Sequence, residues 1–345
     1  MFTKEFTLKN TLKILQSTKG RLTLVAIAIS LVLPLFVSDT YIIRVFTIIA
    51  IFTIYASSWN LLASSGQGSL GHSAFLGIGG FTSSLLAINL GIPPIIGMFI
   101  GAVFSAGIGF LIGLTCVRLK AWYLAMVTFG FYIITEALFL HFDDYTYATL
   151  GFRTPNLVAP GLPYYYFAVL VSIITIGVIY YIMKSKIGLA FRAIHQNATE
   201  ASMTGINTAK YKLYAFVLST FFAGLSGSIF VHFQRNIHIS IFSADNNFQP
   251  LMMSVIGGLG TIEGPIIGSA IMVFIDRFLP GFDGSLQLIL NPLFPAVSNV
   301  GPYVRSLGLG IFLVIVVVFL PKGVSSLLRK LYHYIRTELF TSDKP

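Results

Sequence analysis

The sequence predicts an all-α integral membrane protein, a polytopic bundle of about ten transmembrane or re-entrant helices. Three observations support this fold class. Of the 345 residues, 55% are hydrophobic and only 10% are charged, whereas a typical soluble domain has about 25% charged residues. The mean hydropathy is +0.84. Apolar runs of about 20 residues, long enough to cross a hydrocarbon core about 30 Å thick, recur along the chain.

Composition divides the chain into three parts. A basic segment at 1–21 precedes a membrane domain at 22–325, and a polar tail follows at 326–345. No small-residue cleavage site follows the first apolar run, so we expect that run to stay as a span and not to be removed as a signal. The apolar runs lie near 22–38, 41–63, 70–90, 93–117, 121–141, 163–183, 213–232, 250–279 and 303–321.

Basic residues at the ends of the runs predict the orientation, because cytoplasmic connections of membrane proteins carry an excess of Lys and Arg. We place the N-terminus in the cytoplasm and let the runs alternate, so the loop at 184–212 and the C-terminal tail are also cytoplasmic. All but five of the 22 Lys and Arg residues then face the cytoplasm, the exceptions being Arg44, Arg153, Arg235, Arg277 and Arg305. The net charge of +10 thus indicates membrane topology and not nucleic-acid binding.

This alternation requires the run at 250–279 to cross the membrane twice, or to enter and return. The glycine-rich stretch GGLGTIEGPIIG at 257–268 interrupts it. Residues 251–260 would form a helix about 15 Å long, half the hydrocarbon thickness. Pro265 suits the first turn of a second helix that ends near residue 279. We therefore expect a broken or re-entrant pair of helices.

A second glycine-rich stretch, GQGSLGHSAFLGIGG at 66–80, interrupts the first half of the chain. Irregular backbone at membrane depth occurs where it is buried in protein or lines a cavity, and a pair of such breaks indicates the substrate path of a transporter. The alternative is that the glycines only permit close helix packing. The candidates for the path are Gly66, Gln67, Gly68, Ser69, Gly71, His72, Gly257, Gly258, Gly260 and Glu263.

Side chains suited to catalysis or metal binding are sparse. His72 has no second ligand at metal spacing, so we expect it to bond to backbone instead. Glu136 lies near the predicted outer end of its span, where interfacial solvation explains it as well as a proton relay does. Capping of the helix that begins at Pro265 explains Glu263. We expect no catalytic residue, no metal site and no enzyme activity.

The loop at 184–212 contains an amphipathic segment that is too short and too polar to span. Apolar residues recur in it at helical spacing, at Phe191, Ile194, Ala198 and Ala201. Polar residues four apart form another face, at Arg192, Gln196 and Glu200. Gly205 is placed to end the helix. The pattern suits either a helix lying on lipid headgroups or one docked in a groove of a cytoplasmic partner.

Four stretches carry a family resemblance: SLGHSAFLGIGGF at 69–81, YLAMVTFGF at 123–131, GLAFRAIHQNATEASMTGINTAKYKLYAFVLSTFFAGLSGSIF at 188–230 and VIGGLGTIEGPIIGSAI at 255–271. They resemble the permeases of branched-chain amino acid ABC importers of the LivM type, which are related to LivH and urea-type permeases. The resemblance extends from about residue 45 to 325, in order and at family-like spacing.

The resemblance implies a permease that moves a small polar solute by alternating access, with leucine, isoleucine or valine ahead of urea or short amides. The implied partners are two cytoplasmic ATPase subunits, a second LivH-like permease and an extracytoplasmic binding protein, in a bacterial inner membrane. The chain has no G-x-x-x-x-G-K-[ST] phosphate loop, so ATP and Mg would be used by the ATPase subunits and no cofactor is expected here. Coupling to the ATPase would fall to Arg192, Glu200, Ala201, Gly205 and Ile206.

The rival function is a stand-alone carrier driven by ions or protons. Such a carrier needs ionisable residues that face one another inside the membrane, and the sequence offers only Glu136 and Glu263. One departure from the family lies on the predicted outer face, where TLGFRTPNLVAPGLP at 149–163 replaces a Thr-Gly-Gly…Gly pattern. The solute therefore stays open between amino acids and other small polar molecules.

Overall fold

The computed structural model describes residues 39–116, 119 and 121–278, with separate positions at 34, 310, 314, 318–320 and 323–327. The expected spans at 22–38 and 303–321 and both terminal segments lie almost wholly outside these residues. The described helices are α3 (Thr40–Ala63), α4 (His72–Asn89), α5 (Pro94–Cys116), α6 (Ala121–His141), α7 (Asp143–Thr146), α8 (Leu162–Lys184), α9 (Lys186–Gln196), α10 (Ala198–Met203), α11 (Thr208–Gln234), the 3-10 helix η1 (Ile239–Phe242), α12 (Ala244–Gly257) and α13 (Glu263–Phe278).

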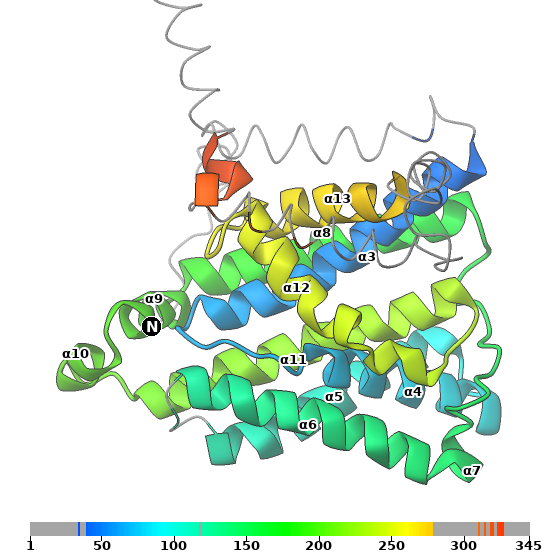
Figure 1. The fold of residues 1–345 in the computed structure, drawn as a ribbon, viewed down its shortest axis with the longest axis horizontal. Coiled ribbons are helices and arrows are strands. Elements are labelled where there is room, and N and C mark those ends of the chain that lie inside the picture. The colour runs from blue at the N-terminus through cyan, green and yellow to red at the C-terminus, as the bar shows by residue number, and fades with distance from the viewer. Residues whose placement is uncertain are drawn as a thin grey trace, which may run out of the picture.

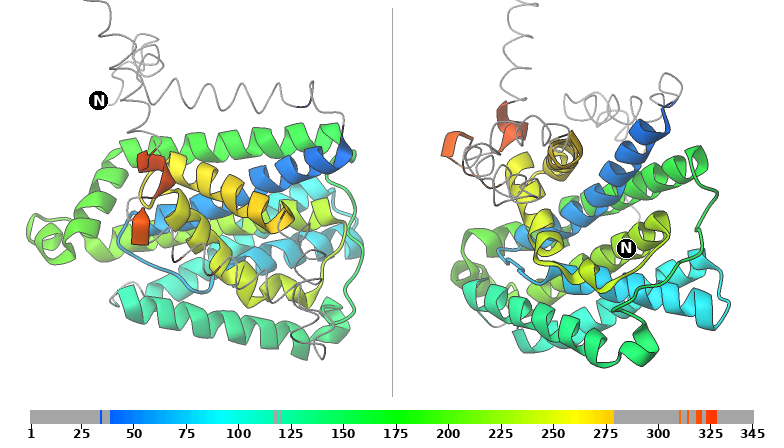
Figure 2. Two further views of the ribbon diagram at one scale, coloured as in Figure 1. Left: turned by 45° about the horizontal axis from the view of Figure 1, so that its top comes forward. Right: turned by 45° about the vertical axis from the view of Figure 1, so that its right-hand side comes forward.

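The long helices lie side by side, with α9 and α10 projecting beyond one end of the bundle and α7 at the other (Figure 1). These are called the α9–α10 end and the α7 end below. Figure 2 shows α8 and α6 on opposite sides of the bundle, with α3 and α11 between them. The described part of the chain is therefore all-helical apart from one isolated bridge between Phe152 and Ile237.

Five described helices are long and apolar enough to cross a membrane, namely α3, α5, α6, α8 and α11. Helices α3 and α11 are largely buried, and they pack against most of the other long helices. Helices α5, α6 and α8 expose large apolar side chains such as Phe104, Met126 and Leu170. An apolar outer surface around a buried centre is what a bundle in lipid requires.

The predicted spans agree closely with these helices. The runs at 41–63, 93–117, 121–141 and 163–183 correspond to α3, α5, α6 and α8 within one residue at each end. Helix α11 begins at Thr208 and not at 213, because the side chain of Asn207 accepts from Lys210 N and starts the helix in polar sequence. An expected count of about ten membrane elements depends partly on residues outside the described ranges.

Small residues set the spacing of the inner helices. A Cβ placed on Gly79 would overlap the backbone of Gly224, and one on Gly109 would overlap the side chain of Thr220. These contacts join α4 and α5 to α11 with backbones in close approach, as small residues do in membrane helix packing. The glycines of 77–80 therefore serve packing, which is the alternative that the sequence left open for this stretch.

The run at 250–279 is a broken pair, as expected: α12 and α13 pack against each other across the turn at 258–262. The expected bounds of 251–260 for the first helix were wrong. Ser243 caps α12 in polar sequence upstream, and Gly258, with φ +124°, ends it. Pro250 lies inside α12. Proline cannot donate to the carbonyl four residues earlier, and Tyr55 Oη donates to that Asn246 carbonyl instead, at 3.0 Å.

Candidate functional site

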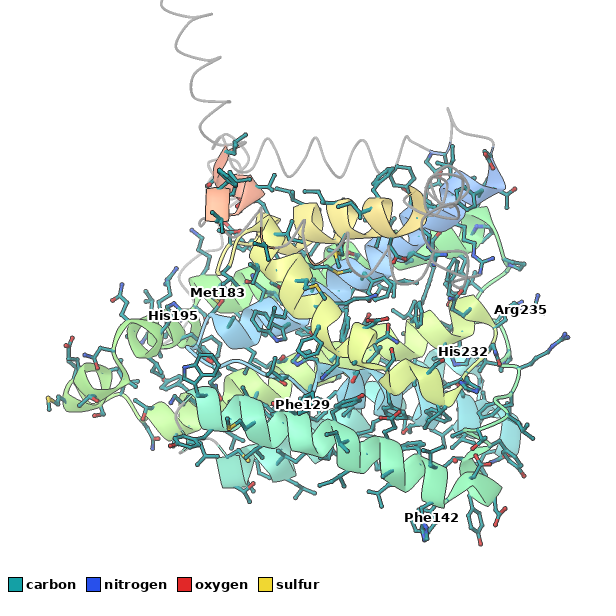
Figure 3. The ribbon with its side chains drawn as sticks, in the orientation of Figure 1. Phe129, Phe142, Met183, His195, His232 and Arg235 are labelled. Atoms are coloured by element: carbon teal, nitrogen blue, oxygen red, sulfur yellow. The ribbon has the colours of Figure 1, made fainter. Side chains whose placement is uncertain are left out.

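The first break, residues 64–71, carries non-helical backbone from the end of α3 into the interior. Gly66 lies against the backbone of His195 at the α9–α10 end (His195 is labelled in Figure 3). Gln67 Nε2 donates to the Lys212 carbonyl at 2.9 Å, whereas His72 contacts Ser219 of α11. Those α11 residues are seven apart, a rise of about 10 Å. Helix α4 therefore begins inside the bundle and not at its end.

Side chains from three other helices satisfy the backbone of this break. Trp59 Nε1 donates to the Ser69 carbonyl at 2.8 Å, and Leu70 N donates to Thr128 Oγ1 at 3.0 Å. The buried amide of Asn247 on α12 donates to the Leu70 carbonyl and accepts from Ser73 N. Non-helical backbone within a membrane needs internal partners of this kind.

The second break, residues 258–262, is held by Asn60, which follows Trp59 in α3. Asn60 Nδ2 donates to the Thr261 carbonyl at 2.7 Å, and Gly260 N donates to Asn60 Oδ1 at 2.8 Å. Glu263 is the first residue of α13, where a carboxylate favours the helix N-terminus. Two consecutive residues of α3 therefore hold the two glycine-rich breaks, which are far apart in sequence.

The glycines among the path candidates have different local roles. Three have left-handed backbone in turns: Gly66 with φ +74°, Gly258 with φ +124° and Gly260 with φ +70°. In two others a Cβ would overlap backbone, since Gly71 meets the Thr128 carbonyl and Gly257 meets the Gly264 carbonyl. A Cβ placed on Gly68 would meet nothing within 4 Å, and its φ is not left-handed, so neither close packing nor turn geometry accounts for this glycine.

His72 is fully buried in the first turn of α4. Its Nε2 is 3.0 Å from Ser219 Oγ, and that hydroxyl donates to the Ser58 carbonyl at 2.7 Å. The expected hydrogen bond from His72 to backbone was therefore wrong. The imidazole instead bonds to the Ser219 hydroxyl, and it is this hydroxyl that donates to the backbone carbonyl of α3. His72 Nδ1 and Ser73 Oγ are buried without hydrogen bonds among the described residues.

The loop at 184–212 forms two short helices and not one. Asn197 ends α9 and caps α10: its Oδ1 accepts from Thr199 N at 3.0 Å and from Glu200 N at 3.3 Å. Its Nδ2 donates to Glu200 Oε1 at 2.6 Å, which joins the two side chains across the first turn of α10. The expected continuous helix is interrupted here because asparagine competes for these backbone groups.

The apolar stripe of the loop faces the protein itself. Phe191, Ile194 and Ala201 are buried, Ala198 is half-buried, and α9 packs on α8 and α11. The apolar stripe is therefore packed against the bundle, and contact with lipid or with a partner would fall to the exposed side of the loop.

The exposed side of the loop is polar, with two apolar residues beside it. It carries Arg192, Gln196, Glu200, Leu189 and Met203. As expected, Gly205 ends the helix: it has φ +86°, and Ile206 N donates to the Ala201 carbonyl at 3.1 Å. The part of the loop that faces outward is thus a short capped helix with fixed ends.

Comparison with known sequences identifies the family of this chain. The family described as "Branched-chain amino acid transport system / permease component" matches residues 41–319. The chain belongs to this family. The permease is 25% identical over 308 residues to the high-affinity branched-chain amino acid transport system permease protein LivM of Escherichia coli K12, covering 80% of this chain and 72% of LivM.

Two further relatives extend the comparison. The permease is 25% identical to the inner membrane ABC transporter permease protein YjfF of Escherichia coli K12, over 74% of this chain and 80% of YjfF. It is 29% identical to the probable branched-chain amino acid transport permease protein LivH of Methanocaldococcus jannaschii, over 40% of each chain. No solved structure matches. The permease is therefore a multi-pass inner-membrane subunit of an ABC system, which acts with ATPase and binding-protein components.

The sequence did not identify the side chains that hold the breaks. Asn60, Thr128 and Asn247 lie in or beside apolar runs, and each binds a segment remote in sequence. A buried amide inside an apolar run is the one signal that was available, since such a group needs a partner. Asn60, inside the run at 41–63, carries that signal most clearly.

Proposed function

We propose that this permease imports leucine, isoleucine and valine by alternating access, driven by two ATPase subunits on the cytoplasmic side. A second LivH-like permease completes the pore, and an extracytoplasmic binding protein delivers the solute at the α7 end. The names of the LivM relatives support the substrate, and the basic residues at 184–212 support a cytoplasmic α9–α10 end with cytoplasmic termini. ATP and Mg are used by the ATPases, not by this chain.

The observation that carries the proposal is how the loop is joined to the bundle. Ser185 is both the C-cap of α8 and the N-cap of α9, so no flexible residue separates these helices. Asn207 caps α11 directly after the turn at Gly205 and Ile206. A force applied to α10 therefore passes to α8 and α11, which pack on α3.

Each coupling residue has a distinct role in this mechanism. Arg192 and Glu200 are exposed and would contact the ATPase surface, whereas buried Ala201 anchors α10 to the bundle. Gly205 and Ile206 form the turn that fixes the angle between α10 and α11. Movement of α3 would then reach Trp59 and Asn60, and through them both breaks of the proposed solute path.

The test is co-expression with the neighbouring ATPase, permease and binding-protein genes, followed by purification through a tag on this chain and reconstitution. We expect a P-loop ATPase to co-purify and leucine uptake to require ATP. Glu200→Arg should reduce ATPase recovery, whereas Arg153→Gln, an exposed change elsewhere in the described chain, should not. Uptake by this chain alone without ATP would instead establish the carrier, and ATP-driven import of urea without leucine would exclude the proposed substrate.

A further inference from the structure

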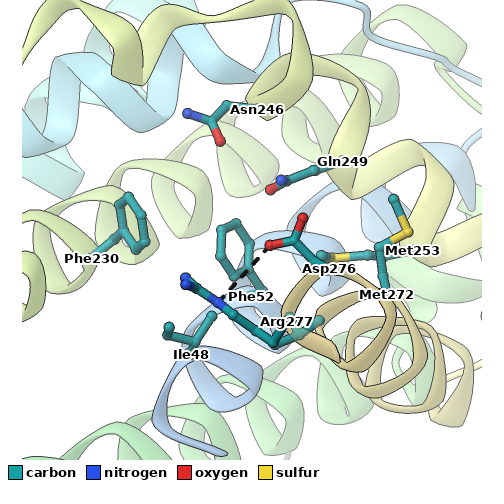
Figure 4. A pocket seen from close by; sticks show the side chains of 10 residues that line it. Ile48, Phe52, Phe230, Asn246, Gln249, Met253, Met272, Asp276 and Arg277 are labelled. Carbon is teal, nitrogen blue, oxygen red and sulfur yellow. Dashed lines mark ion pairs between the residues drawn. The ribbon is translucent and has the colours of Figure 1, made fainter. Parts of the chain in front are cut away.

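A cavity of about 170 Å³ lies between α3, α11, α12 and α13 (Figure 4). It is nearer the α7 end than the breaks are, since Arg277 in its wall accepts a hydrogen bond at its carbonyl from Tyr41 at the start of α3. Asn246 also lines it, one residue before the Asn247 that holds the first break. The cavity therefore lies between the α7 end and the proposed solute path.

One wall of the cavity is apolar. It is formed by the side chains of Ile48, Phe52, Phe230, Met253 and Met272. A cavity of about 150 Å³ lined by such residues accommodates benzene, so this one has the size for a short branched hydrocarbon group. Methionine side chains adapt to irregular shapes, which allows for leucine, isoleucine and valine in turn.

The other wall carries two charged side chains and an amide oxygen without a hydrogen bond among the described residues. Asp276 and Arg277 are consecutive on α13, and Arg277 Nε is 3.9 Å from Asp276 Oδ2, longer than a hydrogen bond. Arg277 Nε and Gln249 Oε1 are buried and make no hydrogen bond within the described part of the chain. Figure 4 shows all three side chains around the same space. Ionisable residues inside a membrane bundle mark solute pathways, and a buried unpaired polar atom calls for an explanation.

We propose that this cavity holds the transported solute on its way in, and that it selects a zwitterionic amino acid with an apolar side chain. The Arg277 guanidinium binds the α-carboxylate. Gln249 Oε1 and the Asp276 carboxylate accept hydrogen bonds from the α-ammonium group. The apolar wall takes the side chain. This inference rests on the proposed function and assigns its substrate a position, while urea and neutral amides lack the two charges that these groups match.

The test is Arg277→Gln in the complete transporter, reconstituted with its ATPases, partner permease and binding protein. The quantity measured is leucine imported per ATP hydrolysed. We expect it to fall about ten- to a hundredfold, because a charged hydrogen bond to the carboxylate is lost. ATPase stimulation by the leucine-loaded binding protein and the yield of the complex should persist. Arg277→Lys should retain part of the import, and Gln249→Leu should lower it.

The control is Arg235→Gln, an exposed arginine at the same end of the bundle and outside the cavity, which should import leucine as before. An unchanged leucine-to-ATP ratio in Arg277→Gln overturns the cavity assignment and leaves the proposed function standing. Equal loss of complex yield and ATPase activity in both Arg277 variants also overturns it, because the arginine is then structural. A wild-type complex that does not import leucine fails the proposed function itself.

Discussion

Asn247 shows how one side chain can make a break in a membrane helix possible. Its amide donates to the Leu70 carbonyl and accepts from Ser73 N; Asn247 and Ser73 are fully buried, and Leu70 is partly buried. Each backbone group left unpaired would cost about 1 to 3 kcal/mol, so this one amide contributes substantially to the stability of the fold. The sequence could not assign this role, because Asn247 and Leu70 are 177 positions apart.

We predict that Asn247→Leu lowers the stability of the permease by about 2 to 6 kcal/mol, because it leaves both backbone groups unsatisfied. Asn247→Asp should cost less, since it keeps an acceptor for Ser73 N. The measurement is the thermal unfolding midpoint of the full chain in detergent. Asn89→Leu, at the exposed end of α4, serves as the control and should change little. An unaltered midpoint for Asn247→Leu would contradict this account of the break.

At the scale of the element, two helices begin well before their apolar runs because a polar side chain caps them upstream. Helices α3, α5, α6 and α8 could be predicted to within a residue because their apolar sequence and their length agree. Helices α11 and α12 begin earlier, since Asn207 and Ser243 start them in polar sequence. The loop divides at Asn197 for the same reason, a local competition that periodicity alone does not contain.

We predict that Tyr55 and Pro250 are energetically coupled through α12. Tyr55→Phe removes the donor to the Asn246 carbonyl and should cost about 1 to 3 kcal/mol. In a Pro250→Ala background the new N–H at 250 can take that carbonyl, so the same change should cost less. A double-mutant cycle on chemical unfolding measures the difference. Additive effects would show that the tyrosine does not compensate for the proline.

We also predict that Gly205→Ala weakens the end of α10 by about 1 kcal/mol, because its φ of +86° strains any residue with a Cβ. Amide exchange over 198–204 should quicken, and ATP-driven uptake should fall with it. Gly177→Ala is the matched control, since Gly177 is helical and its Cβ would meet open space. Equal exchange rates in the Gly205 variant and the parent protein would count against a rigid coupling turn.

The whole molecule has two unlike ends. One carries the capped helices α9 and α10, and the other carries α7 and the connection at 147–161, which pairs with the chain after α11 through Phe152 and Ile237. His232 holds that connection: its Nδ1 lies 2.7 Å from the Pro155 carbonyl and its Nε2 lies 2.8 Å from Ser83 Oγ. The basic residues at 184–212 indicate that the α9–α10 end faces the cytoplasm.

We predict that the ends label from opposite sides of the membrane. Met203→Cys and Leu150→Cys place thiols at highly exposed positions on the α9–α10 end and in the 147–161 connection at the α7 end. Cys116 is buried and is the sequence's single cysteine, so Cys116→Ala gives a clean background. An impermeant thiol reagent should reach residue 203 in inside-out vesicles and residue 150 in right-side-out vesicles. The reverse pattern would invert the proposed orientation.

The two adjacent side chains at the end of α3 have a mechanical consequence. Trp59 binds one break and Asn60 binds the other, and neighbours on a helix point about 100° apart around its axis. Any rotation of α3 therefore displaces both breaks at once, along different directions. If the two breaks form opposite sides of a passage, a twist of this single helix changes the shape of that passage without sliding any helix along the membrane normal. A substitution that uncouples either residue should leave one side of the passage still while the other moves.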